Sequence, residues 1–424
     1  MILLSIIPWN FYGGKGMPGP GYYWIGKEEE DEVLDVIRSH YLFRYGDEKD
    51  PNFKKKVYTL EGEISKKFGC RYALSVTSGT AALIVALTAA KIGPGDEVIV
   101  PGYTFIASMS SVIACGAVPV LAEVDDSLTL DPADVEKRIT PKTKAILAVH
   151  MLGNPCDMDR LSALAKKHKL LLIEDSAQSF GGMYKGKYLG TLGLLGIYSF
   201  NFFKTINAGD GGMVVTDDEE LFKTAFSFHD QGHLPHRAGV EVGNRSIIGW
   251  NFRMNELTAA FLLAQFRRLD KLKDGLTRVK SRYKKQLGGI EGLKFRKLND
   301  PGECATLLTV LLPTADIAEK VCAELGTKPI SHSGWHVYNN MEQILGKKQL
   351  TPGPPFQSKE FPTNVEYSKG MLPVTDDLLS RAVNISIGVI DAGLGSAFGV
   401  NPLSSDDEID KKAETFIKTV RKYL

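Results

Sequence analysis

The residue with the clearest chemical potential is Lys204, which stands between an aromatic run at 197–203 and a glycine-rich turn at 209–212. Aromatic neighbours can remove water from a lysine, which lowers the pKa of the amine and makes it a nucleophile and a proton carrier. Most lysines are solvated surface residues, so the position alone favours that simpler interpretation. The motifs elsewhere in the chain must decide between the two.

A second candidate is the acidic pair that ends the apolar run 170–173, Glu174 and Asp175, with Gln178 just beyond. Open α/β sheets bind ligands at the carboxyl ends of their strands, and a carboxylate there could pair with a protonated ring nitrogen. The alternative is that Asp175 only caps the helix that follows. The sequence leaves both interpretations open.

A third candidate is the small-residue turn of Ser78, Gly79 and Thr80, which follows the apolar run 72–76 and precedes a predicted helix at 81–90. Free backbone N–H groups, a hydroxyl and the positive end of the helix dipole together suit a phosphate group. For these three residues taken alone, an ordinary Ser/Thr helix cap is the favoured interpretation. The motif is weak by itself.

The elements that must position these residues follow an α/β pattern. Short runs rich in Val, Ile and Leu are separated by helix-length segments, which predicts parallel strands with crossover helices. The strands are expected at 98–100, 118–121, 145–149 and 170–173, with a crossover helix at 158–168. One long helix is expected from 254 to about 287, as the hinge into a second domain with a strand at 306–313 and helices at 317–325 and 406–423. The segment 331–363 is expected to be irregular.

Composition limits the class of protein. A chain of 424 residues predicts two domains, which we place at 1–265 and 266–424. Because 51 basic and 50 acidic side chains nearly cancel, no nucleic-acid or membrane partner is expected. The apolar start of the chain lacks a basic segment, and no run of about 18 apolar residues occurs, so neither a signal peptide nor a membrane-spanning helix is expected.

The cysteines and histidines do not indicate a metal. Five widely spaced cysteines form no CxxC pair, which favours a reducing cytoplasm over disulfides or zinc. His229, His233 and His236 could be taken for ligands, but no carboxylate or cysteine stands at a ligand spacing from them. A mobile active-site loop is the preferred interpretation of 229–245.

Taken in order, the motifs resemble the DegT/DnrJ/EryC1/StrS aminotransferases, which are pyridoxal 5'-phosphate (PLP) enzymes that aminate keto sugars, often nucleotide-linked. The resemblance runs from about Trp24 to the C-terminus. It depends on Ser78-Gly79-Thr80, Pro101-x-x-Thr104-Phe105, Glu174-Asp175-x-Ala177-Gln178, Ser199-Phe200, Lys204, Gly209-x-Gly211-Gly212 and Asn251-x-Arg253. A closer likeness to the 8-amino-3,8-dideoxy-octulosonate transaminase branch is carried by Phe43-Arg44-Tyr45, Lys204-Thr205-Ile206, Gly249-x-Asn251-Phe252-Arg253 and Trp335-His336.

The resemblance implies the PLP-dependent transferase fold type I, similar to aspartate aminotransferase, with a large, mostly parallel sheet domain and a smaller C-terminal α+β domain. It implies that Lys204 binds the cofactor covalently and that Asp175 pairs with the ring nitrogen. The other cofactor contacts that it implies are Ser78, Gly79, Thr80, Phe105, Gln178, Ser199 and, from the second subunit of a homodimer, Asn251. The substrate contacts that it implies are Arg44, Tyr45, Asn201, Arg253 and His336. Asn201 departs from the family pattern, since many relatives carry His or Asp there.

The function that the resemblance implies is transfer of an amino group from an amino acid, glutamate or glutamine, to a keto sugar that is nucleotide-linked or an 8-keto octulosonate. One alternative is a related PLP-dependent sugar dehydratase, in which His replaces the lysine, so Lys204 argues against it. The other is a non-catalytic regulatory protein that has kept the fold.

Overall fold

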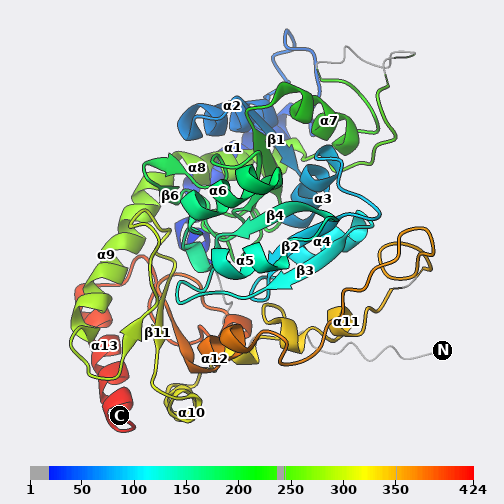
Figure 1. The fold of residues 1–424 in the computed structure, drawn as a ribbon. Helices are drawn as coiled ribbons and strands as arrows, with labels where there is room; N and C mark the ends of the chain where they lie inside the picture. The colour runs from blue at the N-terminus through cyan, green and yellow to red at the C-terminus, as the bar shows by residue number, and fades with distance from the viewer. Residues whose placement is uncertain (1–18, 236–242, 244, 350) are drawn as a thin grey trace, which may run out of the picture.

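The computed structural model describes residues 19–235, 243, 245–349 and 351–424 (Figure 1). The predicted absence of a signal peptide concerns residues 1–18, and His236 belongs to the loop 236–242, so both lie outside the described residues. Within the described part of the chain, no helix is both long enough and apolar enough to cross a membrane.

A seven-stranded sheet forms the larger part of the molecule, with strand order β1-β9-β8-β5-β4-β2-β3. The strands are β1 (Tyr72–Val76), β2 (Glu97–Pro101), β3 (Val118–Ala122), β4 (Thr143–Val149), β5 (Leu171–Asp175), β8 (Leu195–Ser199) and β9 (Gly212–Thr216). All pairings among β3, β2, β4, β5 and β8 are parallel, and β9 is antiparallel to both of its neighbours. The four predicted parallel strands are therefore confirmed.

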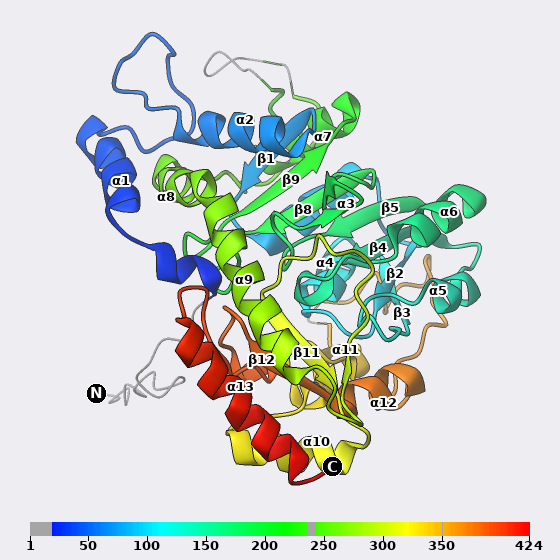
Figure 2. The ribbon, with the colours of Figure 1, turned by 90° about the vertical axis from the view of Figure 1, so that its left-hand side faces the viewer.

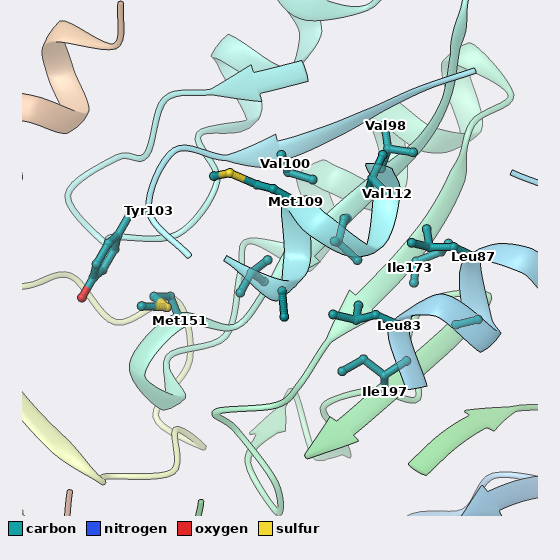
Figure 3. Close-up of a cluster of buried hydrophobic side chains, with 14 of the residues drawn as sticks. Leu83, Leu87, Val98, Val100, Tyr103, Met109, Val112, Met151, Ile173 and Ile197 are labelled. Carbon is teal, nitrogen blue, oxygen red and sulfur yellow. The ribbon is translucent and has the colours of Figure 1, made fainter. Parts of the chain in front are cut away.

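Both faces of this sheet are covered by helices, as the apolar character of its strands requires. One face packs with α3 (Gly79–Ala89) and α4 (Ala107–Ala114), which contribute side chains to the cluster in Figure 3, and with α7 (Glu219–His229). The other face packs with α2 (Lys56–Phe68) and α8 (Glu256–Arg267) at one end, and with α5 (Pro132–Arg138) and α6 (Met158–His168) at the other. Successive residues alternate between the faces, as Ile197 and Tyr198 do on β8.

The C-terminal part contains a three-stranded antiparallel sheet of β10 (Lys294–Phe295), β11 (Leu307–Leu311) and β12 (Ala382–Ser386). One face of it packs with α9 (Leu269–Leu287), α10 (Ala315–Leu325) and α13 (Asp406–Arg421) (Figure 2). The other face, through Leu307, Leu311 and Ala382, joins the main cluster. The smaller elements are β6 (Met183–Tyr184), β7 (Lys187–Tyr188), α11 (Glu342–Leu345) and α12 (Pro373–Arg381).

The single long helix predicted from 254 to 287 is wrong, because the structure has two helices, α8 and α9, separated at Arg268. Arg268 leaves the helical conformation at φ −105°, ψ 9°, while its Nε atom donates to the Ala264 carbonyl at 3.1 Å. Its guanidinium also forms ion pairs with Glu28 and Glu29 of α1 (Lys27–Ser39). The break lies close to the boundary at residues 265 and 266, which stays a prediction.

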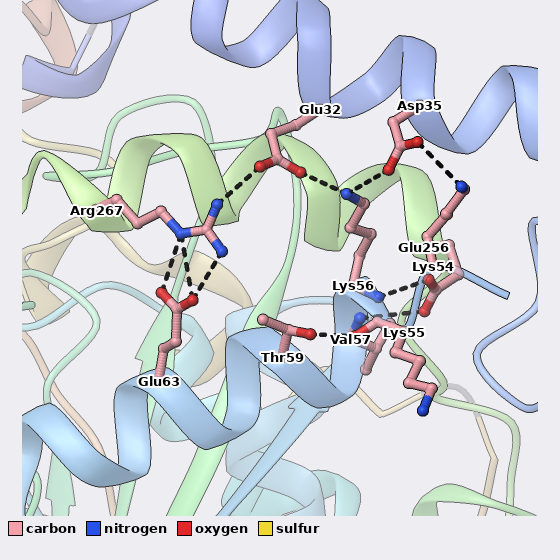
Figure 4. A network of polar contacts seen from close by, with 10 residues as sticks. All are labelled: Glu32, Asp35, Lys54, Lys55, Lys56, Val57, Thr59, Glu63, Glu256 and Arg267. Atoms are coloured by element: carbon pink, nitrogen blue, oxygen red, sulfur yellow. Dashed lines mark hydrogen bonds and ion pairs between the residues drawn. The ribbon is translucent and has the colours of Figure 1, made fainter. Parts of the chain in front are cut away.

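A network of ion pairs and hydrogen bonds holds the N-terminal helices α1 and α2 against α8 (Figure 4). Arg267 binds Glu32 of α1 and Glu63 of α2, both at 2.8 Å. Glu256, at the start of α8, accepts the backbone N–H groups of Lys56 and Val57 at the start of α2. Because α2 leads into β1, this network fixes the approach to the turn at Ser78.

Candidate active site

A cavity of about 430 Å³ opens at the carboxyl ends of β5 and β8 and is closed on its other side by C-terminal segments. Parallel strands end at one edge of a sheet, so segments far apart in sequence meet there. Ten of the predicted site residues line this cavity: Ser78, Gly79, Thr80, Phe105, Asp175, Gln178, Ser199, Asn201, Lys204 and His336.

Lys204 lies on a tight turn between β8 and β9. The Lys204 N–H donates to the Asn201 carbonyl at 2.9 Å, and the Phe203 N–H donates to the Asn201 side chain at 3.2 Å. Gly19 lies so close that a Cβ there would be 2.2 Å from the Phe203 carbonyl carbon. Burial lowers the pKa of Lys204, against the opposing charges of Asp175 and Asp391. The amine is therefore held in a fixed position and loses its proton more easily than a surface lysine does.

Asp175 ends β5 with a buried carboxylate. Its Oδ2 accepts the Ser108 hydroxyl at 2.7 Å, and its Oδ1 accepts the Ala177 N–H at 3.1 Å. Ser108 in turn lies 2.7 Å from the Thr104 hydroxyl. Burial raises the pKa of Asp175, while Ser108, Ala177 and Lys204 oppose that rise. The bond to Ala177 closes a local turn, and residues 176–182 contain no helix, so the interpretation that Asp175 caps a following helix is wrong.

Sequence reasoning missed Ser108. Thr104 and Ser108 stand four residues apart at the start of α4, a spacing that places two side chains on one face of a helix. This spacing could have linked the Thr104 motif to a second hydroxyl. It could not have identified Asp175 as the acceptor, 67 residues away.

The small-residue turn combines a helix cap with a close backbone approach. The Ser78 hydroxyl accepts the Ala81 N–H at 3.0 Å, so Ser78 is the N-cap, and α3 begins at Gly79 rather than at the predicted residue 81. A Cβ on Gly79 would lie 2.6 Å from the Ser199 Cβ. The absence of a side chain therefore lets the start of α3 lie directly beside Ser199, and the first residues of the helix, whose N–H groups have no partner within a helix, line the cavity.

Gln178 projects from the segment after β5, and its Oε1 accepts the Leu152 N–H at 3.0 Å. Leu152 lines the cavity in a left-handed conformation, with φ 55° and ψ 33°. Sequence reasoning missed Leu152, because a leucine carries no signal of that conformation.

Part of the cavity wall is formed by aromatic side chains. Phe105 is 40% exposed toward the cavity, with its ring centroid 5.3 Å from His336 and 6.5 Å from Trp335. His336 is buried and its Nδ1 lies 2.9 Å from the Ser333 hydroxyl. Burial, with the charge of Lys204, lowers the pKa of His336 to about 3, so its imidazole is neutral. Asp391, which follows β12, also lines the cavity, and no local pattern predicted it.

Arg44 corrects one prediction, since it does not line this cavity and is only 1% exposed. Its guanidinium lies 3.2 Å from both Glu61 carboxylate oxygens, donates to the Ser75 carbonyl at 3.4 Å and lies 3.2 Å from His229 Nε2. A side chain so enclosed cannot reach a substrate. Arg44 instead holds α2, β1 and α7 together.

Tyr45, Asn251 and Arg253 also lie outside the cavity that contains Lys204. The Tyr45 hydroxyl donates to Asp230 at 2.7 Å, and Arg253 forms an ion pair with the same carboxylate at 2.5 Å. Asn251 is exposed. The segment 250–253 runs beside the end of β1, where the Thr77 N–H donates to the Phe252 carbonyl at 3.0 Å. These residues therefore neighbour the small-residue turn but face away from its cavity.

The histidine stretch contains a buried structural histidine. His229 Nδ1 lies 2.5 Å from the Phe226 carbonyl and its Nε2 faces Arg44, so a neutral ring satisfies both contacts. Burial, with the charge of Arg44, lowers the pKa of His229 to about 3. Across residues 19–235, 243, 245–349 and 351–424, no group of His, Cys, Asp and Glu side chains is arranged to hold a metal ion.

Comparison with known proteins gives consistent matches. The model of the DegT/DnrJ/EryC1/StrS aminotransferase family matches residues 24–389. GDP-perosamine synthase of Escherichia coli O157:H7 is 37% identical over 306 residues, which cover 72% of this chain and 80% of that protein. A UDP-N-acetyl-3-dehydro-alpha-D-glucosamine 3-aminotransferase of Acidithiobacillus ferrooxidans is 41% identical over 234 residues, 55% of this chain and 62% of that protein. The X-ray structure of the aminotransferase from Psychrobacter cryohalolentis matches with a TM-score of 0.77 at 27% identity, covering 94% of this chain and 98% of that one.

Proposed function

This chain belongs to the DegT/DnrJ/EryC1/StrS aminotransferase family of PLP-dependent enzymes, and from that membership we propose that it transfers an amino group from glutamate or glutamine to a keto sugar. The observation that carries the proposal is the meeting of Lys204, Asp175 and Gln178 in one cavity. The three residues come from different segments and supply an amine, a carboxylate and an amide. Two of the similar proteins named above carry a GDP- or UDP-linked sugar in their names, and a nucleotide-linked sugar or an 8-keto octulosonate is the proposed acceptor.

The residues of the cavity fit PLP. When bound, PLP supplies an aldehyde for attachment to an amine and a ring that accepts electrons. Gly79 and Thr80 line the cavity at the start of α3, and because Gly79 has no side chain, Ser199 lies directly against this helix start, where backbone N–H groups can bind a phosphate. Phe105 offers an exposed ring face on the opposite wall, against which a planar group can stack.

Lys204 and Asp175 have different roles in moving and holding protons. Burial lowers the pKa of Lys204, so its Nζ loses a proton more easily than that of a surface lysine and could then attack a carbonyl carbon and accept and return a proton. Asp175 accepts hydrogen bonds from Ser108 and Ala177 that favour its ionised form, and as a carboxylate it would keep the ring nitrogen of a bound cofactor protonated. Burial of both groups strengthens their interaction with a bound molecule.

Groups that could bind sugar hydroxyls lie beside Lys204. Asn201, the neutral His336 and Asp391 all line the cavity and can donate or accept hydrogen bonds. Such groups suit a polyhydroxyl substrate better than an apolar one. We assign Asn201 and His336 to the keto sugar on this basis and add Asp391, which the sequence did not indicate.

We further propose that the enzyme is a homodimer in which Asn251 and Arg253 of one chain complete the site of the other. Among the described residues that line the cavity there is no arginine to pair with the carboxylate of an amino acid. An apolar patch, made of Leu42, Phe43, Ile248 and Trp250, surrounds this segment. Its members are 49%, 47%, 93% and 63% exposed, and such a patch on a soluble surface commonly marks an interface.

The half-reaction with an amino donor tests the aminotransferase proposal. PLP-loaded protein mixed with glutamate or glutamine should lose its visible absorption band and release the corresponding 2-oxo acid, and Lys204→Ala should do neither. Trapping of the aminated sugar after addition of a keto sugar completes the cycle. Uptake of PLP without conversion of any amino acid would instead favour the regulatory alternative.

A mixture of two inactive variants tests the shared site. Lys204→Ala and Asn251→Ala chains, each impaired alone, should together recover roughly a quarter to a half of wild-type activity, because one site of the heterodimer carries both lesions and the other none. If heterodimers form and activity does not return, Asn251 does not act across the dimer.

A further inference from the structure

The turn that follows β4 is held by a loop from the other end of the chain. Arg296 donates to the Met151 carbonyl at 3.2 Å and to the Leu152 carbonyl at 2.8 Å, and the Cys304 N–H donates to the Gly153 carbonyl at 3.0 Å. Three successive carbonyl groups therefore accept from the loop between β10 and β11. Arg296 itself is 4% exposed, so these are interior bonds.

The turn needs such support because of its conformation. Leu152 has φ 55° and ψ 33°, the left-handed region that residues other than glycine rarely occupy. A residue persists there only when its surroundings fix it. The Met151 side chain is enclosed in the main core cluster, which anchors one end of the turn (Figure 3). The two bonds from Arg296 fix the carbonyl groups on either side of the Leu152 N–H.

The conformation of the turn decides the orientation of Gln178. The Leu152 N–H can only donate, so the Gln178 atom 3.0 Å away must be the amide oxygen. The Nε2 group, which has two donors, is then available to a ligand in the cavity that Gln178 lines. If the amide were reversed, an oxygen would face the ligand and a donor would face a donor.

Arginine is suited to this position. Its planar fork reaches two carbonyl groups at once, whereas lysine has a single ammonium nitrogen on a flexible chain. Its buried charge is balanced by Glu303, whose Oε2 lies 3.5 Å from Arg296 and whose Oε1 lies 2.5 Å from Lys280. Burial of a charged side chain such as Arg296 costs free energy of desolvation. The two carbonyl contacts and the Glu303 carboxylate offset that cost.

We propose that Arg296 is a positioning residue for the cofactor: through the Met151 and Leu152 carbonyls it holds the turn whose N–H fixes the Gln178 amide with its NH₂ group toward the phenolic oxygen of PLP. This inference rests on the proposed contact between Gln178 and the cofactor. Arg296 touches neither cofactor nor substrate, and it belongs to the C-terminal part of the chain. It therefore couples the packing of that part to the electronic state of the cofactor.

Binding of pyridoxamine 5'-phosphate in a double-mutant cycle tests the proposal without turnover. Arg296→Met and Gln178→Leu should each weaken binding about tenfold, the effect of one hydrogen bond, and the double variant should be less than about twofold weaker than Gln178→Leu alone. Arg278→Met is the matched control, because Arg278 also joins a carbonyl and a carboxylate, Ser404 and Asp406, but lies away from the turn. It should leave binding unchanged.

Two further measurements exclude a general loss of structure. Arg296→Lys keeps the buried charge beside Glu303 but cannot span both carbonyls, so amide exchange at Leu152 should accelerate about tenfold while amides in α13 stay unchanged. In PLP-loaded protein, the pH at which the visible band titrates should rise equally in Arg296→Met and Gln178→Leu, because the phenolic oxygen loses a donor in both.

Additive losses in the cycle, or unchanged exchange at Leu152, would overturn the role of Arg296. Failure of the wild-type protein to convert an amino donor would instead reject the proposed function, and the exchange measurement, which needs neither substrate nor cofactor, would still report on the turn. If Gln178→Leu alone leaves cofactor binding unchanged, the contact between Gln178 and the cofactor is absent and the inference fails with it.

Discussion

Removal of one hydroxyl, in Ser108→Ala, should raise the pH at which the enzyme loses activity in acid. Ser108 donates to Asp175 Oδ2 at 2.7 Å inside the protein, and the Ala177 N–H donates the other hydrogen bond that the described residues make to this carboxylate, at 3.1 Å. Hydrogen bonds to charged groups contribute ~1.5–3 kcal/mol. Loss of this bond should raise the pKa of Asp175, and at ~1.4 kcal/mol per tenfold change in an equilibrium it should move the acid limb of activity upward by about one to two pH units.

The direction of the effect follows from the role of the carboxylate. Asp175 must be ionised to keep the ring nitrogen protonated, so activity is lost as the pH falls through the pKa of Asp175. A higher pKa therefore moves the acid limb of the kcat/KM profile upward. At alkaline pH, where Asp175 is ionised in both proteins, kcat/KM of Ser108→Ala should approach that of the wild type.

The assay is the pH dependence of kcat/KM for the amino donor, with Ser111→Ala as the control. Ser111 is also buried on α4, and among the described residues its hydroxyl has no hydrogen-bond partner. Ser111→Ala should therefore leave the acid limb in place. An acid limb that does not move in Ser108→Ala, or one that moves equally in both variants, would refute the assignment of Ser108 to Asp175.

Three other predictions follow from the geometry of the site. Lys204→Ala should abolish the half-reaction, and Asp175→Asn should slow it by orders of magnitude, as measured by single-turnover absorbance. Circular dichroism should show that both variants stay folded. Normal turnover in either variant would remove that residue from the mechanism. Gly79→Ala should weaken binding of pyridoxamine 5'-phosphate, measured by calorimetry, because the new Cβ would lie 2.6 Å from the Ser199 Cβ; unchanged affinity would place the phosphate elsewhere. His229 and His336 have a folded pKa of about 3, below the unfolded value of ~6.5, so each should cost ~2 kcal/mol of stability as the pH falls from 7.5 to 5. The free energy of unfolding of His336→Gln, measured with urea, should show about half of this combined loss between pH 7.5 and 5. A loss as large as in the wild type would mean that His336 is protonated in the folded state.

The sequence by itself determined the type of fold and most of the cavity. The strands could be predicted because each is a local run of Val, Ile and Leu, and burial on both faces of a parallel sheet requires such a run. Asp175 and the turn at Gly79 could be found because each stands next to the end of such a run, and Lys204 because it stands between an aromatic run and a glycine-rich turn. Strand ends of one sheet meet at one edge, so local patterns were sufficient to bring these residues together.

The tertiary structure alone decided what the residues beyond the strand ends do. The sequence around Arg44 suggested a substrate contact, yet its contacts with Glu61 and His229 enclose it. The break at Arg268 coincides with ion pairs to α1. Ser108 reaches Asp175 across 67 residues, and Arg296 reaches Leu152 across 144. Such contacts produce no periodic or compositional pattern in the sequence. The partners come close together only after all the elements between them in the chain have packed.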